Sequence, residues 1–274
     1  MPELPEVETI RQALRQGGRD GPPVLGKRIL RAHLLWERTL ATPRPEEFRE
    51  RIRGQVITEV DRRGKFLSLR LSEDTLLLHL RMSGDILIEP ESQPPAAHHR
   101  LMLDLEDGLR LAFNDTRKFG RAWLVADAAE VLNGLGPEPL SPEFTSQELQ
   151  RRLEGRSRQI KSLLLDQSVV AGLGNIYVDE ALHLAGLHPL KAAGELDTTQ
   201  VERLWASIQY VLEEGIRRNG ASIDWVYRGG DFQNYFRVYG RTGEPCPNCG
   251  APIQRIVVGQ RGTHFCPQCQ PHAD

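Results

Sequence analysis

The sequence predicts an α+β protein in which a short helix and a two-layer antiparallel β-sandwich precede a helical domain and a small metal-binding hairpin. Three observations support this prediction. From about residue 27 to 125, short β-rich runs alternate with turn residues. Beyond residue 142, apolar residues recur at helical spacing. All four cysteines of the chain lie in the last segment, from Cys246 onward.

The first helix is predicted over residues 3–16. Pro5 suits the first turn of a helix, and apolar residues such as Leu4, Val7 and Ile10 recur at near-helical spacing. The strands that follow are predicted from their β-branched and aliphatic residues and their spacing, which is typical of an antiparallel sandwich. These runs are RILRAHLLW, QVITEV, KFLSLRL, TLLLHLRM, DILIE, RLMLDL, LRLAF and RAWLV.

The residue pattern changes in the second half of the chain. The stretch GLGPEPLSP contains three prolines and two glycines, which predicts a linker. Four amphipathic segments follow, with the glycine-bearing turn VVAGLGN between the second and the third: SQELQRRLE, SRQIKSLLLDQ, NIYVDEALHLAG and TTQVERLWASIQYVLEEGIRR. We therefore expect a sandwich domain at 1–133, a linker at 134–141, a helical domain at 142–240 and a cysteine hairpin at 241–274.

Composition excludes several classes of protein. The formal net charge of −2 argues against a generally basic nucleic-acid coat protein, although local clusters of Lys and Arg occur at 110–121 and 151–161. A single cluster of this kind is more often a solvated face than a binding site. No apolar run approaches the roughly 18 residues of a membrane span, and the acidic start MPELPEVET is unlike a signal peptide. We expect a cytosolic protein without a membrane partner.

The four cysteines predict a structural zinc site. Cys246-x-x-Cys249 and Cys266-x-x-Cys269 are separated by sixteen residues, and four thiolates fill the tetrahedral shell of one Zn²⁺. Free thiols or a redox pair are the alternative reading of these cysteines. Arg261 lies between the two pairs, where a hairpin tip would present it either to a phosphate or simply to solvent.

The N-terminal residues suggest a nucleophile. Methionine before proline is normally removed, which would leave Pro2 with a free secondary amine. A free α-amine has a pKa near ~8, against ~10.4 for lysine, so more of it is unprotonated and able to form a Schiff base. Glu3 would lie beside it as a general acid or base, and Glu6 falls on the same helix face. The alternative is an ordinary helix start, with acids favoured by the helix dipole.

Six motifs in one chain together resemble the formamidopyrimidine-DNA glycosylase family, bacterial enzymes that repair oxidised purines. They are MPELPEVET, HLRMSG, NDTRKFG, LGPEPL, GLGNIYVDEAL and RVYGRTGEPCPNCG, and the resemblance runs from Met1 to Gln270. The start PELPE is also more similar to this family than to the endonuclease VIII family, which usually has Gly where this chain has Leu4.

The resemblance implies a bifunctional glycosylase and AP lyase of base excision repair, with a helix–two-turn–helix domain. Pro2 would attack C1′ of the damaged nucleotide, Glu3 would transfer protons, and β- and δ-elimination would cut the strand. Lys65 matches a lysine near the scissile phosphates, although in isolation it would be read as a surface residue. Arg261 matches a finger arginine linked to δ-elimination, and Glu6 is assigned to the base pocket.

Further residues match positions of the family that contact DNA. Those expected to contact the DNA are His98, Arg117, Arg156, Lys161 and Asn175, and those expected to fill the space left by an extruded base are Met82, Arg117 and Phe119. Core packing is the alternative for Met82 and Phe119, and a helix N-cap is the alternative for Asn175. Residues 219–234 correspond to a lid over the base. Arg81 and Lys118 depart from the usual Gly and Arg of the family.

These implications lead to one principal hypothesis and two rivals. The principal hypothesis is a monomer that binds damaged double-stranded DNA, contains one structural Zn²⁺ and needs no redox cofactor. The rivals are an oxidised-pyrimidine glycosylase of the endonuclease VIII type and a non-catalytic zinc-finger DNA-binding protein.

Overall fold

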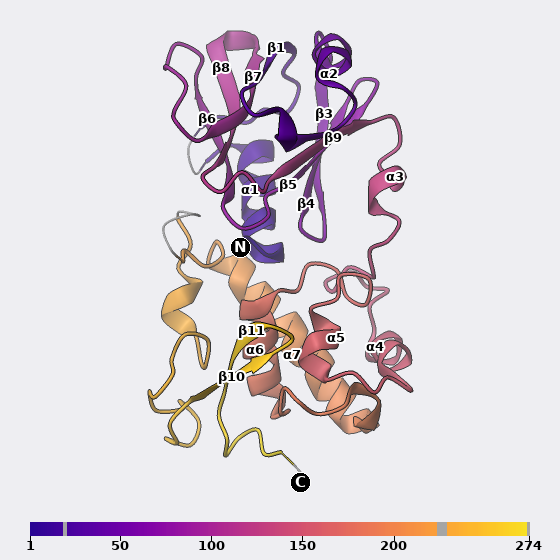
Figure 1. The fold of residues 1–274 in the computed structure, drawn as a ribbon, viewed down its shortest axis with the longest axis vertical. Helices are drawn as coiled ribbons and strands as arrows, with labels where there is room; N and C mark the ends of the chain where they lie inside the picture. The colour runs from indigo at the N-terminus through magenta and orange to yellow at the C-terminus, as the bar shows by residue number, and fades with distance from the viewer. Residues whose placement is uncertain (19–20, 224–228, 273–274) are drawn as a thin grey trace. The chain divides into compact units, whose positions relative to one another are not determined.

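The computed structural model describes residues 1–18, 21–223 and 229–272. The chain forms two compact units (Figure 1). Unit 1 consists of Met1–Asn133 together with Asn219–Gly230, and unit 2 consists of Gly134–Arg218 together with Asp231–Asp274.

Unit 1 contains one N-terminal helix and two β-sheets, as predicted. The four-stranded sheet is antiparallel in the order β1(Ile29–Leu34), β7(His99–Leu105), β8(Leu109–Asp115), β6(Gly84–Pro90). The five-stranded sheet has the order β2(Leu40–Thr42), β9(Arg121–Val125), β5(Thr75–His79), β4(Phe66–Leu71), β3(Ile57–Arg63). In this second sheet β2 pairs with β9 in parallel, and the other pairs are antiparallel.

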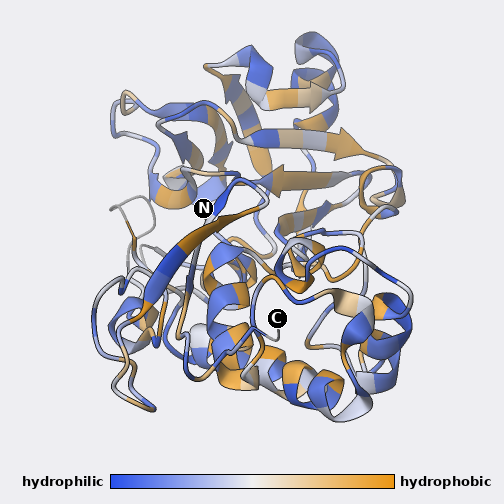
Figure 2. Cartoon of the chain, turned by 60° about the horizontal axis from the view of Figure 1, so that its bottom comes forward, coloured by the Kyte–Doolittle hydropathy of each residue, from blue (hydrophilic) through white to orange (hydrophobic). Residues whose placement is uncertain are grey.

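Alternation along the strands builds the core between the sheets. On β4, Leu67 and Leu69 are fully buried while Arg70 is exposed, which is the period of two expected for a sheet with one dry face. Apolar residues of both sheets and of the first helix belong to one continuous hydrophobic cluster. The same alternation is visible as interleaved hydrophobic and hydrophilic bands along the elements (Figure 2).

The helix α1(Leu4–Gln16) positions the N-terminus of the chain. Val7 and Ile10 lie in the core of unit 1, and α1 contacts β3 and β4. Glu3 is the N-cap residue, and the Glu6 carboxylate accepts its backbone N–H at 2.8 Å. The predicted range of 3–16 is therefore confirmed, with Glu3 as the cap. Because the helix is anchored along its apolar face, Pro2 and Glu3 have defined positions.

Unit 2 contains the predicted helical segments and a terminal hairpin. Its helices are α4(Ser146–Leu153), α5(Ile160–Leu164), α6(Asn175–Ala185) and α7(Thr198–Arg217), and its hairpin is β10(Gln254–Val258) with β11(Arg261–Phe265). The helix α6 packs against α7, and β11 contacts α6. A capping box between Asp197 and Gln200 sets the start of α7.

Several short elements were not predicted. They are α2(Pro45–Ile52), α3(Ala129–Leu132) and the 3₁₀ turns η1(Glu37–Thr39), η2(Glu106–Gly108), η3(Ala193–Glu195) and η4(Phe232–Tyr235), in addition to β2. The helix α5 is also shorter than the segment predicted at 157–167. The backbone N–H of Ile160 donates to the carbonyl of Lys191 instead of to a preceding helical turn, so α5 starts only there.

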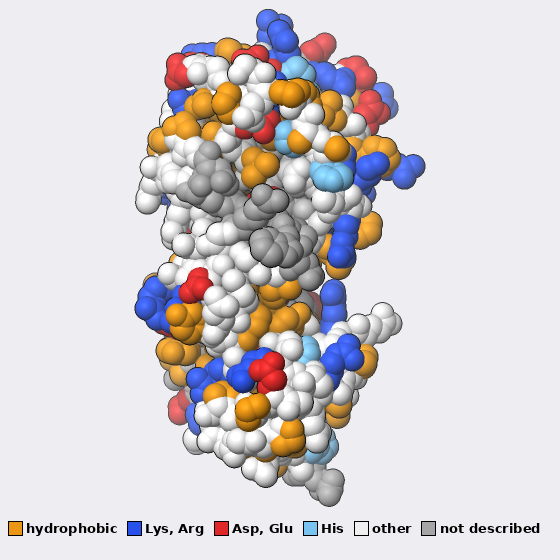
Figure 3. Space-filling view, turned by 90° about the vertical axis from the view of Figure 1, so that its left-hand side faces the viewer, with side chains coloured by type: hydrophobic (Ala, Val, Ile, Leu, Met, Phe, Trp, Pro, Cys, Tyr) orange, Lys and Arg blue, Asp and Glu red, His pale blue; other side chains and the backbone are white. Residues whose placement is uncertain are grey.

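The surface carries charge of both signs. Figure 3 shows basic and acidic side chains interspersed on the face it draws, as expected from the nearly balanced composition. Among the described residues, no helix combines the length and the apolar character that crossing a bilayer requires.

Candidate functional site

The N-terminal residues form a tightly held group in unit 1. Pro2, Glu3 and Glu6 are all buried. One oxygen of the Glu6 carboxylate accepts the N–H of Glu3, and the other accepts the N–H of Ala221 at 2.7 Å. Glu6 thus links the start of α1 to the segment that begins at residue 219. A buried carboxylate with two backbone donors is fixed in place, which suits a group that positions the residues around Pro2.

Lys65 lies in the turn between β3 and β4 and is only 6 % exposed. The interpretation of Lys65 as an ordinary surface lysine is therefore wrong. Burial, together with the nearby charges of Arg81 and Lys65, lowers the pKa of His79 on β5 to about 3. His79 is consequently neutral at pH 7, and its Nδ1 accepts the N–H of Arg81 at 3.1 Å. Two cations therefore lie near an uncharged ring.

Met82 and Phe119 lie on two loops of unit 1 and are exposed to 38 % and 54 %. The alternative that they pack in the core is therefore wrong. Met82 lies between β5 and β6, and Phe119 lies between β8 and β9. Arg117 is exposed beside them, with its Nη1 at 3.6 Å from the sulfur of Met82. Of the three side chains that the family resemblance groups together, Arg117 thus contacts Met82, and Phe119 lies two residues beyond Arg117 on the same loop.

His98 is exposed, whereas the adjacent His99 is buried. The backbone carbonyl of His98 accepts the N–H of Asp115 at 2.8 Å, which places it beside the loop of Arg117. Of the two neighbouring histidines, only His98 presents its ring to solvent.

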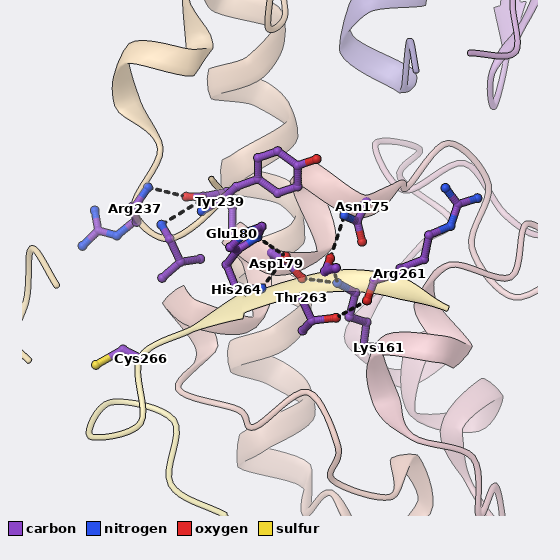
Figure 4. Close-up of polar contacts among 12 residues, drawn as sticks. Lys161, Asn175, Asp179, Glu180, Arg237, Tyr239, Arg261, Thr263, His264 and Cys266 are labelled. Atoms are coloured by element: carbon purple, nitrogen blue, oxygen red, sulfur yellow. Dashed lines mark hydrogen bonds and ion pairs between the residues drawn. The ribbon is translucent and has the colours of Figure 1, made fainter. Parts of the chain in front are cut away.

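In unit 2, the side chain of Asn175 is hydrogen-bonded to the backbone of the residue that follows Arg261. Asn175 is the first residue of α6, and the N-cap is Gly174, so the N-cap alternative for Asn175 is wrong. Its Nδ2 donates to the carbonyl of Gly262 at 2.9 Å, while its Oδ1 is buried without a partner in the described part of the chain. Arg261 is exposed, and its guanidinium points away from the buried acids of α6 (Figure 4).

Lys161 requires a correction. Its side chain is 0 % exposed, and its Nζ lies 2.6 Å from Oδ1 of Asp179 and 3.2 Å from the carbonyl of Gly262. An ammonium without exposed surface does not reach a phosphate, so the DNA contact predicted for Lys161 is wrong in this structure. Lys161 instead neutralises a buried acid and holds the residue next to Arg261. Arg156, by contrast, is exposed.

Two neighbouring acids of α6 were missed by the sequence analysis. Asp179 also accepts the backbone N–H of His264 at 2.9 Å, on β11. Glu180 accepts three backbone N–H groups, those of Arg237 at 2.8 Å, Val238 at 3.0 Å and Tyr239 at 2.8 Å (Figure 4). Burial raises the pKa of Glu180. An acid pair within an otherwise apolar helix is the signal that would have identified them.

The sulfur atoms of the four cysteines lie as close together as a zinc site requires. The Sγ atoms of Cys246, Cys249, Cys266 and Cys269 lie within 4.8 Å of one another. The pairs Cys246–Cys269 and Cys249–Cys266 are 3.8 and 3.4 Å apart, close to the edge of about 3.8 Å for a tetrahedron with Zn–S of about 2.3 Å. The site fits one structural Zn²⁺, with no ligand position left for water.

His183 on α6 adds an outer contact to this site. Its Nε2 lies 3.4 Å from Sγ of Cys246, and its Nδ1 is buried without a partner among the described residues. Burial lowers the pKa of His183 to about 4, so the ring carries one N–H at neutral pH. That proton belongs on Nε2, where it faces a thiolate, because on Nδ1 it would be a buried donor with no acceptor.

Comparison with protein families finds three matches that together span most of the chain. Residues 1–122 match the formamidopyrimidine-DNA glycosylase N-terminal domain, and residues 135–226 match the formamidopyrimidine-DNA glycosylase H2TH domain. Residues 243–271 match the zinc finger found in FPG and IleRS, which agrees with the geometry of the four cysteines.

Individual proteins are similar over 90 % or more of their length. The formamidopyrimidine-DNA glycosylase of Protochlamydia amoebophila is 44 % identical, over 98 % of this chain and 99 % of its own. That of Symbiobacterium thermophilum is 46 % identical, over 99 % and 90 %. Among solved structures, Lactococcus lactis FPG with FAPY-dG DNA has a TM-score of 0.90 at 37 % identity, covering 98 % of this chain and 100 % of its own. MutM with carbocyclic 8-oxo-G DNA has a TM-score of 0.90 at 39 % identity, covering 99 % and 100 %.

We expect His79 to make the stability of the protein depend on pH. Because burial lowers its pKa from 6.5 to about 3, the unfolded state binds the proton more readily, and stability is lost as the pH falls from 6.5 toward 3. Urea unfolding at pH 7 and pH 4 should show that the wild type loses about 3 kcal/mol more than His79→Asn. Equal losses in the two proteins would contradict a neutral buried His79.

We expect His183→Phe to weaken zinc binding, because the Cys246 thiolate loses a hydrogen-bond donor. Transfer of zinc to a coloured chelator should be about 10-fold more favourable in the variant, a loss typical of outer-shell partners. His183→Gln retains an N–H donor and serves as the matched control. Indistinguishable chelator titrations for wild type and His183→Phe would rule the contact out.

We expect Lys161→Met to destabilise unit 2 by about 3–5 kcal/mol, since Asp179 would keep a buried charge without its main partner. The double variant Lys161→Met/Asp179→Asn should recover much of this loss. The dependence of DNA affinity on salt should keep its wild-type slope in the double variant. A slope reduced by about one would instead indicate a direct phosphate contact.

Proposed function

Because the chain belongs to the formamidopyrimidine-DNA glycosylase family, we propose that it is a bifunctional DNA glycosylase and AP lyase that excises oxidised purines, such as 8-oxoguanine and formamidopyrimidines, from duplex DNA in base excision repair. The solved relatives named above, in complex with FAPY-dG DNA and 8-oxo-G DNA, support this substrate class. The observation that carries the proposal is the anchored N-terminus, where a buried Pro2 directly precedes the capped helix α1.

Removal of Met1 would give Pro2 a secondary amine, the nucleophile of the proposed mechanism. Its lone pair attacks C1′ of the damaged nucleotide, and the bond from C1′ to the base breaks as the base leaves with a proton. The amine then loses its proton, and the C1′–O4′ bond of the sugar ring breaks as O4′ takes up a proton. The nitrogen and C1′ are thereby joined as an iminium ion, which acidifies the proton on C2′. Glu3 is adjacent to the amine in the chain and buried, and we assign to it the proton transfers at the sugar.

Two eliminations cut the strand in this mechanism. Loss of the C2′ proton expels the 3′ phosphate by β-elimination, and a second proton loss expels the 5′ phosphate by δ-elimination. Water then hydrolyses the Schiff base and restores the amine of Pro2. We assign Lys65 to the scissile phosphates, because it lies with Arg81 beside the neutral His79. Arg261 would stabilise the phosphate expelled in δ-elimination.

The remaining DNA contacts are proposed for exposed residues of both units and for the half-buried Asn175. They are His98, Arg117, Arg156 and Asn175, with Met82, Arg117 and Phe119 filling the space of the extruded base. The lid proposed at 219–234 is attached to α1 through the hydrogen bond from Ala221 to Glu6, and its residues 224–228 lie outside the described part of the chain. Glu6 would therefore shape the base pocket by holding the start of this segment.

The zinc site has a structural role in this proposal. When bound, Zn²⁺ would crosslink the two cysteine pairs and so stabilise the segment that carries β10 and β11, including Arg261. We expect the enzyme to act as a monomer on chromosomal DNA in the bacterial cytosol. No observation favours the endonuclease VIII type, since the matched families and the relatives named above are formamidopyrimidine-DNA glycosylases.

Borohydride trapping tests the mechanism directly. Incubation with a duplex containing 8-oxoguanine and borohydride should yield a covalent protein–DNA adduct, because the reductant converts the Schiff base to a stable amine. Peptide mapping should place the adduct on residue 2. A variant that retains residues before Pro2 should form no adduct and should not nick the strand, but it should bind the duplex with a similar salt dependence.

Each alternative predicts a different result. Strand nicking that survives the blocked N-terminus would refute Pro2 as the nucleophile. Duplex binding without excision or adduct in the unblocked protein would indicate a non-catalytic DNA-binding protein. A parallel duplex with an oxidised pyrimidine gives the third comparison, since faster excision there would indicate the endonuclease VIII type.

A further inference from the structure

Two loops of unit 1 carry the side chains assigned to the space of the extruded base. The first, between β5 and β6, contains Met82, and the second, between β8 and β9, contains Arg117 and Phe119. Each loop has one residue with a left-handed backbone, Arg81 with φ 54° and Lys118 with φ 61°. Such conformations are costly for residues other than glycine, so the surrounding contacts must hold them.

Asp115, the last residue of β8, supplies these contacts in the second loop. Its carboxylate is buried, and Oδ1 accepts the N–H of Arg117 at 3.1 Å while Oδ2 accepts the N–H of Gly120 at 2.7 Å. Its own carbonyl accepts from Nε of Arg100 at 2.7 Å. The carboxylate therefore closes the loop that carries Arg117 and Phe119, as one acceptor bridging its two ends.

Ser83 connects this loop to the other one. Its hydroxyl donates to Oδ1 of Asp115 and also accepts the N–H of Arg117 at 3.0 Å. Ser83 directly follows Met82 and is itself buried. A single hydroxyl thus joins the loop of Met82 to the loop of Arg117 and Phe119.

Phe113 limits movement of both loops from below. A Cβ at Gly84, after the first loop, would lie 2.5 Å from the carbonyl oxygen of Leu80 and 2.8 Å from the ring of Phe113. A Cβ at Gly120, after the second loop, would lie 2.4 Å from the same ring. At these two glycines, both loops therefore pack directly against one buried aromatic side chain.

The outer side of the second loop has a further support. Nζ of Lys118 lies 4.2 Å from the ring centroid of Trp36, a cation–π contact. Lys118 is one of the two departures from the usual residues of the family, and its contact with Trp36 fixes the residue between Arg117 and Phe119. The loop is held from inside by Asp115 and from outside by Trp36.

We propose that Asp115 and Ser83 are positioning residues that join the two loops into one rigid wedge, so that Met82, Arg117 and Phe119 enter the base stack together. This inference rests on the proposed function, in which a base is extruded. Extrusion costs a few kcal/mol in lost stacking and pairing. Side chains that are already ordered can offset this cost by filling the vacated space, because they lose no further conformational entropy. Loops that moved independently would have to be ordered during the same step.

Base extrusion and strand cleavage respond differently to a loosened wedge. An intact 8-oxoguanine must be unpaired and unstacked before Pro2 reaches C1′, whereas an abasic site has no base to extrude. Loss of the Ser83 hydroxyl should therefore slow excision of the base far more than nicking at an abasic site. A purely structural role for Ser83 would lower both activities together.

The test compares Ser83→Ala, Asp115→Asn and the control Ser72→Ala, which removes a hydroxyl at an exposed bend of the same unit. Single-turnover excision of 8-oxoguanine should fall about tenfold in Ser83→Ala, as for loss of one hydrogen bond to a charged group, and further in Asp115→Asn. Nicking at an abasic site should stay within about twofold of wild type in Ser83→Ala, a loss well under that of one hydrogen bond.

Amide hydrogen exchange in the free protein provides a readout that does not depend on activity. Exchange at Arg117 should accelerate in Ser83→Ala and remain unchanged in Ser72→Ala. Unchanged exchange in Ser83→Ala would overturn the coupling of the loops, and equal loss of excision and nicking would overturn the wedge role. A wild type inactive on both duplexes would refute the proposed function and the wedge role with it, while the exchange result would still decide whether the loops are coupled.

Discussion

Buried carboxylates that accept backbone N–H groups hold the functional loops of this protein in place. Glu6 binds the segment at Ala221, Asp115 closes the loop of Phe119, and Asp179 and Glu180 bind the terminal part of unit 2. Burying a carboxylate is unfavourable unless donors surround it, so each of these acids stabilises only one arrangement of the loop opposite. The acids thus add the specificity of directed hydrogen bonds to the packing of these loops.

The helix α6 holds the terminal part of unit 2 through several polar side chains. Asn175, Asp179 and His183 recur every four residues along α6, so they share one face, and all three contact the segment that contains the zinc site. Glu180 extends the contact to residues 237–239. The position of Arg261 therefore depends on α6 as well as on the zinc site, because the carbonyl of the next residue accepts from Asn175. The metal site and α6 therefore both constrain this hairpin.

The sequence predicted the elements whose signals are local. Apolar periodicity identified α1 and the main strands, and the two cysteine pairs identified the metal site, because both signals depend on residues close in the chain. The partner of a buried charge is not a local property. Lys161 is separated from Asp179 by a turn and part of a helix, and nothing in a basic segment distinguishes a buried lysine from an exposed one. For the same reason Asp115 and Ser83 were missed, although both lie within motifs that had been singled out.

The choice of acids over apolar anchors follows from what these loops must do. An apolar side chain in place of Asp115 would fill the volume but leave the buried N–H of Gly120 without its acceptor, at about 1–3 kcal/mol, and would leave the N–H of Arg117 with Ser83 alone. The loop would then turn these groups toward water, and Phe119 would move with it. A carboxylate satisfies both donors from beneath, so the outer surface of the loop stays free for exposed Arg117 and Phe119. The buried carboxylate of Asp115 thus allows the apolar side chain of Phe119 to remain exposed on the outer surface of the loop.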